Sequence, residues 1–80
     1  MSREEVKNKV FEIFQNFFGN SVELTESSSQ KTVKAWDSVA QMQLLGAVEK
    51  EFAVKIKMKQ ILKIEKLGDF INAVCELKEI

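Results

Sequence analysis

An aspartate and a serine stand side by side in the segment KAWDSVAQMQLL, where apolar residues begin to recur at helical spacing. Asp37 suits the N-cap of that helix, because its carboxylate can accept a hydrogen bond from a backbone N–H of the first turn. Ser38 then falls in the first turn, where free N–H groups and the positive end of the helix dipole favour a phosphate. Ser38 therefore either only assists the helix start or carries an attached group, and position alone leaves both interpretations open.

The rest of the sequence offers little for catalysis. It contains no histidine, which removes both the usual general base for a serine or cysteine nucleophile and a usual zinc ligand. Its one cysteine, Cys75, has no partner for an internal disulfide and is expected to be inert. We therefore predict a protein that is not an enzyme, with no catalytic residues and no metal site.

Length and charge narrow the remaining functions. Eighty residues, 45% of them hydrophobic and 30% charged, are expected to form one domain over residues 1–80. Twelve basic and twelve acidic residues cancel, so no strong field draws the chain to nucleic acid or to an anionic membrane. The apolar runs are too short for membrane insertion, and the N-terminus has no apolar signal segment. We expect a cytoplasmic monomer.

Helical periodicity and stop signals predict an all-α fold. The first helix has Ser2 and Glu5 in capping-box positions and Gly19 as its stop. The segment AVKIKMK alternates like a strand but has no partner, so we interpret it as an extended connection. The predicted helices cover residues 2–18, 38–52, 59–64 and 68–77, with a long loop over 20–36. Three longer helices and one short third helix make a four-helix bundle.

The predicted core is formed by apolar side chains at helical spacing. Gly46 interrupts the second helix at a cost of about 1 kcal/mol relative to alanine. We expect it to serve close helix packing, with room for an apolar group as the alternative. The core candidates are Val6, Val10, Ile13, Phe14 and Phe17, then Val39, Met42, Leu44, Leu45, Val48 and Phe52, then Ile61, Leu62 and Ile64, and finally Phe70, Ile71, Val74 and Leu77.

The segment WDSVAQMQLLGAVEKEFAVKI, followed by ILKIEKLGDFINAV, resembles the acyl carrier proteins and the related peptidyl carrier domains. Asp37, Ser38 and Val39 occupy the Asp-Ser-Leu attachment motif of that family, with valine in place of the usual leucine. EKEF closes the second helix as in the family, and LGDFINAV resembles its last helix. Together with helix order and length, the resemblance covers nearly all 80 residues and implies a four-helix bundle of acyl-carrier type.

The resemblance implies that a phosphopantetheinyl transferase moves 4′-phosphopantetheine from coenzyme A onto Ser38, between Asp37 and Val39, which makes the protein a phosphoprotein. Acyl or aminoacyl cargo would hang as a thioester on this arm, and acyl-loading and acyl-transferring enzymes of fatty-acid, polyketide, nonribosomal peptide or related pathways would be the partners. Residues predicted to meet partners are Trp36, Met42, Gln43, Glu49, Lys57 and Lys59, and possible acyl-chain contacts are Leu45, Gly46 and Val48. For Trp36 the favoured alternative is an anchor in the core.

The charge pattern departs from that of fatty-acid carriers. Those proteins typically present acidic residues on the second helix, where this chain has Ala40, Gln41 and Gln43. Five lysines against Glu65 make residues 55–66 locally basic, either as a solvated face or as a partner site. This pattern favours a specialised pathway. The alternative function is an unmodified helical adaptor that binds a protein through the second helix or residues 55–66, and Ser38→Ala would leave its function nearly intact.

Overall fold

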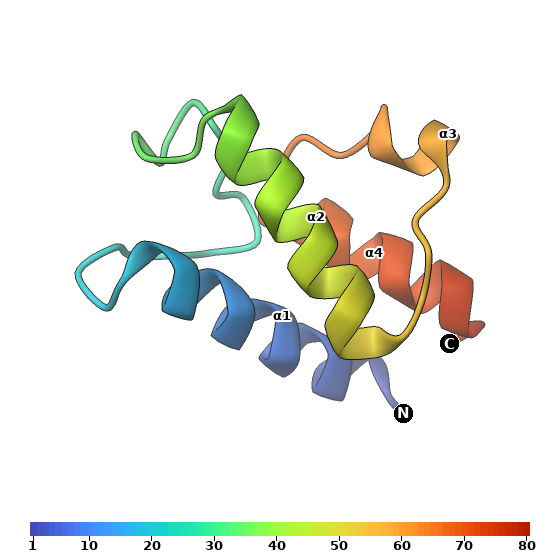
Figure 1. Ribbon diagram of the computed structural model, residues 1–80. Coiled ribbons are helices and arrows are strands. Elements are labelled where there is room, and N and C mark those ends of the chain that lie inside the picture. Colours follow the sequence, from blue (N-terminus) through green and yellow to red (C-terminus); the bar gives the residue numbers. More distant parts are fainter.

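The computed structural model describes all 80 residues and contains four helices, α1 (Arg3–Phe18), α2 (Ser38–Phe52), α3 (Met58–Ile61) and α4 (Leu67–Lys78) (Figure 1). The segment between α1 and α2 contains no helix, only turns, bends and one end of an isolated β-bridge. The predicted all-α four-helix bundle with a long first loop is therefore confirmed. None of the four helices is both long and apolar enough to span a membrane.

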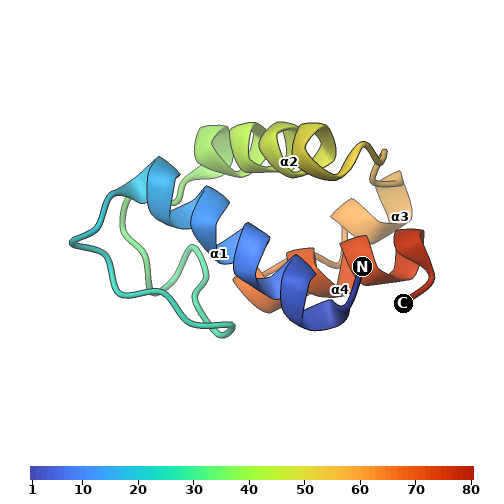
Figure 2. The ribbon, with the colours of Figure 1, turned by 90° about the horizontal axis from the view of Figure 1, so that it is seen from below.

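The helices form layers with α1 in the middle position. Figure 2 shows α2 on one side of α1 and α4 on the other, and α1 packs against both of them. The two chain ends lie at the same end of the molecule in both views (Figures 1 and 2). This arrangement leaves α2 covered by protein on one face only.

Local sequence signals set the helix ends. The hydroxyl of Ser2 accepts a hydrogen bond from the Glu5 N–H, and the Glu5 carboxylate accepts one from the Ser2 N–H, as predicted for a capping box. The pKa of the Glu5 carboxyl is lowered, mainly by the hydrogen bond from the Ser2 backbone and next by the one from the Ser2 hydroxyl. Gly19 ends α1 with a positive φ of 94°, a conformation that glycine adopts without strain.

An aromatic cluster joins the helices to the long loop. The ring of Phe14 in α1 contacts those of Trp36 and Phe70 edge-on, with centroid distances of 5.2 and 5.0 Å. Trp36 is 1% exposed, and its indole N–H donates to the side-chain oxygen of Gln41 at 2.8 Å. The tryptophan therefore anchors the end of the loop in the core directly before α2.

The middle of the loop is fixed to the start of α4. The N–H of Leu67 donates to the Ser28 carbonyl, and the N–H of Gly68 donates to the Glu26 carbonyl, each at 2.9 Å. A Cβ at Gly68 would stand 3.1 Å from that Glu26 oxygen, so this close approach favours glycine. Together with the buried Val33, these bonds hold a long segment without helices against the bundle.

Several details of the predicted core are wrong. Phe17, Val39, Met42 and Leu62 are exposed, because they lie on helix faces or ends turned away from the shared core. Gly46 does not serve helix packing, since no other part of the protein lies within 4 Å of where its Cβ would be. The third helix ends three residues earlier than predicted, at Ile61, and the last helix is one residue longer at each end.

Candidate functional site

Ser38 is the first residue of α2, and its hydroxyl is free. The carboxylate of Asp37 already caps the helix by accepting a hydrogen bond from the Ala40 N–H at 2.8 Å, as predicted. Ser38 is exposed, and its hydroxyl forms no hydrogen bond within the protein. The backbone N–H groups of Ser38 and Val39 also lack protein acceptors. The serine is therefore not needed for the cap, and its oxygen is accessible at the positive end of the helix.

The chain holds this serine between two buried anchors. Trp36 lies two residues before Ser38, and the backbone N–H of Trp36 donates to the Val33 carbonyl at 3.0 Å. Ala40 follows it by two residues and is 4% exposed. Because both neighbours are fixed in the core, the Ser38 backbone is held firmly while its side chain faces solvent. A group attached to the Ser38 oxygen would therefore project into solvent without disturbing the fold.

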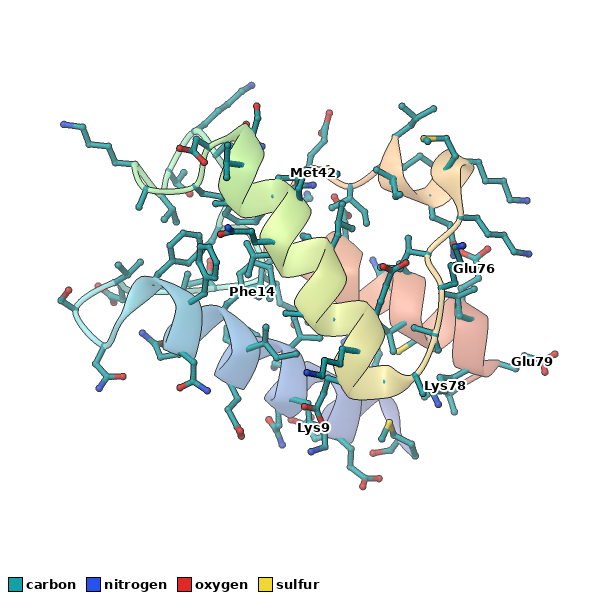
Figure 3. All side chains as sticks on the ribbon, viewed as in Figure 1. Lys9, Phe14, Met42, Glu76, Lys78 and Glu79 are labelled. Atoms are coloured by element: carbon teal, nitrogen blue, oxygen red, sulfur yellow. The ribbon has the colours of Figure 1, made fainter.

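The outer face of α2 carries no charge near Ser38. Val39 and Met42 are 65% and 69% exposed, and Gln43 and Gly46 are also exposed. No residue from Ser38 to Val48 is charged. Figure 3 shows Met42 on the edge of α2 that is turned toward α3. A partner that approaches Ser38 along α2 therefore meets a neutral and partly apolar surface.

The structure separates several residues that the sequence grouped together. Leu45 and Val48 are buried in the core, whereas Gly46 is exposed on the opposite face, so these three residues do not line one space. None of the surface hollows is lined by any of them. Trp36 is also buried, which places it as the core anchor and not as a surface that partners touch.

Three further predicted residues lie in or beside the connection from α2 to α3, with Glu49 in α2, Lys57 directly before α3 and Lys59 in α3. The Glu49 carboxylate accepts a hydrogen bond from the Ile56 N–H at 2.8 Å, so it holds this connection against α2. Lys57 and Lys59 are exposed and form no ion pair. Sequence reasoning missed Met58 and Leu62 as surface residues, although their positions among lysines could have indicated exposure.

Comparison with known families finds a match that includes the start of α2. Residues 36–74 match the family described as the phosphopantetheine attachment site. This segment belongs to the phosphopantetheine-binding carrier family. It starts at Trp36, contains Ser38 and runs through α3 into α4. No curated protein matches the chain.

Domains of this family carry 4′-phosphopantetheine as a covalently attached group and are not themselves catalysts. Such a domain implies interaction with a phosphopantetheinyl transferase and with enzymes that handle acyl groups. The residues around the start of α2 fit this group. The hydroxyl of Ser38 is free, two backbone N–H groups face the same end of the helix, and the carboxylate of Asp37 is bonded to Ala40.

Proposed function

We propose that Ser38 is the attachment residue and that the protein, as one domain over residues 1–80, carries acyl or aminoacyl groups between enzymes of a biosynthetic pathway such as fatty-acid, polyketide or nonribosomal peptide synthesis. One observation carries this proposal. Within the segment that matches the attachment-site family, Ser38 is an exposed helix-start serine whose hydroxyl the fold does not use, because Asp37 supplies the cap. A serine that only assisted the helix start would be expected to bond to the backbone of the first turn.

The attachment reaction makes Ser38 a substrate of the transferase. The Ser38 oxygen forms a bond to the phosphorus of coenzyme A that carries pantetheine. The bond from that phosphorus to the oxygen that bridges the two phosphates breaks, and adenosine 3′,5′-bisphosphate is released. The hydroxyl proton passes to a base of the transferase, because this chain has no histidine to accept it. When bound, the group supplies a terminal thiol that holds the cargo as a thioester.

The residues of this chain position the attached group and leave the chemistry to partners. Asp37 fixes the start of α2, and Val39 provides an apolar flank beside the attachment point. The free N–H groups at this end of the helix favour the negative charge of a phosphodiester. The negative charge of Asp37 opposes it, so the arm is not held down on the surface and remains able to reach a docked enzyme. Tethering gives the cargo a high effective concentration there.

Intact mass spectrometry tests this proposal. The protein is incubated with coenzyme A, magnesium and a broad-specificity phosphopantetheinyl transferase, beside the Ser38→Ala and Ser27→Ala variants. Ser27 is a matched control because it is exposed and its hydroxyl has no hydrogen-bond partner. We expect one added phosphopantetheine in the wild type and in Ser27→Ala, and none in Ser38→Ala. No addition to the wild type with several transferases would favour the unmodified adaptor.

A further inference from the structure

The four most exposed large apolar side chains lie on two elements, the helix α2 that begins at Ser38 and the segment around α3. Val39 and Met42 in α2 are 65% and 69% exposed, and Met58 in α3 and Leu62 directly after it are 69% and 77% exposed. The other exposed large apolar side chains, Met1, Phe17 and Ile80, are all covered to a greater extent, and two of them are chain ends. We call Val39, Met42, Met58 and Leu62 the docking face.

Hydrogen bonds from α2 hold α3 in place beside it. Glu49 in α2 accepts a hydrogen bond through its backbone carbonyl from the Val54 N–H at 3.1 Å and through its carboxylate from the Ile56 N–H at 2.8 Å. Ile56 is 3% exposed and anchors the connection in the core. Met42 lies on the edge of α2 turned toward α3 (Figure 3). The connection that leads to α3 is therefore fixed to α2, and Met42 lies on the edge of α2 that is turned toward α3.

Gly46 continues the outer face of α2 one turn beyond Met42. A glycine inside a helix costs about 1 kcal/mol relative to alanine, and the fold gives no reason for it, because nothing lies within 4 Å of the missing Cβ. The absence of a side chain creates a flat place on the outer surface. It lets the backbone or a side chain of a docked protein approach α2 closely.

Charge is distributed unevenly over the molecule. All three ion pairs of the fold use basic residues of α1, namely Arg3 and Lys7 with Glu26, and Lys9 with Glu51. By contrast, Lys57, Lys59 and Lys63 around α3 are exposed and unpaired. No charged side chain lies on α2 between Ser38 and Val48 to offset them. The α3 part of the docking face thus carries three lysines that form no ion pair, and two of them, Lys59 and Lys63, line a surface hollow together with Asp69 and Glu76 of α4.

We propose that this face binds partner enzymes whose own contact surface is apolar at the centre and carries carboxylates at the edge next to α3. The proposal rests on the proposed carrier function, since it names the kind of enzyme that would receive the attached group. Opposite charges at the edge of an interface speed encounter and set its orientation, while like charges exclude wrong partners. Enzymes with a basic contact surface are therefore rejected.

A binding experiment with two synthetic probes tests the chemistry of the partner. Both are helical peptides with the same leucine stripe, flanked by glutamates in one and by lysines in the other. Each is titrated into the full-length protein labelled for NMR. We expect the acidic peptide to shift the amide signals of Met42, Gly46, Met58 and Leu62 and to bind at least about ten-fold more tightly than the basic peptide, a difference that shrinks at high salt.

Two charge reversals define the edge of the interface. Lys59→Glu is expected to weaken binding of the acidic peptide several-fold, and the double variant Lys57→Glu/Lys59→Glu about ten-fold or more. Lys78→Glu is the matched control, because it makes the same charge change at the far end of α4 from the docking face (Figure 3). Gly46→Gln is expected to weaken binding without unfolding the protein, because its side chain projects from the flat place.

Equal binding of the two peptides, signal shifts elsewhere on the protein, or no shift at millimolar peptide would each overturn the proposed partner chemistry. Selective binding to vesicles of anionic lipid instead of to the acidic peptide would do so as well. Attachment of phosphopantetheine to the wild-type protein is measured separately by intact mass. If Ser38 accepts the group but the peptides are not distinguished, the docking proposal fails while the carrier function stands. If Ser38 accepts nothing, the carrier function itself fails.

Discussion

Replacing Gly46 by alanine should make the protein more stable. The residue lies inside α2 and faces solvent, with nothing within 4 Å of the added Cβ, so the methyl group creates no clash. The gain is the difference in helix propensity, about 0.8 to 1 kcal/mol. An unfolding entropy of about 2.1 cal/mol/K per residue gives roughly 170 cal/mol/K for this chain, so the expected rise in Tm is about 5 °C.

Urea denaturation followed by circular dichroism measures this gain, with an unchanged m-value showing that only stability has changed. Gly68→Ala is the matched control, because Gly68 is also helical but its Cβ would press against the Glu26 carbonyl at 3.1 Å. We expect that variant to be no more stable than the wild type, and less stable if the loop cannot shift. A Gly46→Ala protein that is less stable than the wild type would show that this face of α2 is packed, and would refute the reasoning.

Three further predictions concern the elements that position Ser38. Asp37→Ala should cost about 1 kcal/mol of unfolding free energy in urea, with a smaller loss for Asp37→Asn, because the N-cap acceptor disappears; equal losses would contradict a cap role. Trp36→Ala should lower the free energy of unfolding by about 3 to 5 kcal/mol, because a buried side chain is removed. Trp36→Phe should lower it less, because it keeps much of the buried ring, although it loses the hydrogen bond to Gln41. Urea midpoints and near-ultraviolet circular dichroism distinguish the two variants. The pKa of Glu5 is lowered in the folded protein, so its carboxylate stabilises the fold above the unfolded pKa, and this contribution is lost as the pH falls through the folded value. Urea midpoints measured against pH should therefore fall more steeply at acidic pH in the wild type than in Glu5→Gln, and parallel curves would contradict the capping box.

Signals that act over a few residues could be read from the sequence. The capping box at Ser2, the stop at Gly19 and the N-cap at Asp37 were all predicted, because each depends on bonds within one helical turn. The anchoring of the long loop by Trp36 was also accessible, since the loop offered few other large apolar side chains. The helices and the position of Ser38 followed from these local features.

The inward and outward faces of α2 could not be separated in the same way. Val39 and Met42 are as apolar as the buried Leu44 and Leu45, so spacing alone made the core stripe too wide. For Gly46, the cost in helix stability could be predicted but not the reason for the glycine, because only the arrangement of the other helices shows that nothing packs there. Leu62 was misplaced for a related reason, since the short α3 ends before it.

These errors all concern residues whose identity the fold does not require. A core residue is constrained by its neighbours, whereas an exposed methionine or leucine gains nothing from folding and is open to selection for another role. In this protein such residues occur on α2 and around α3, and two of them, Val39 and Met42, lie within four residues of the serine that the fold leaves free. The same helix uses Leu44 and Val48 to hold the bundle together and its opposite face to present Ser38. Substitutions on that outer face should therefore change binding more than stability, and Gly46 is the position where the two effects are expected to have opposite signs.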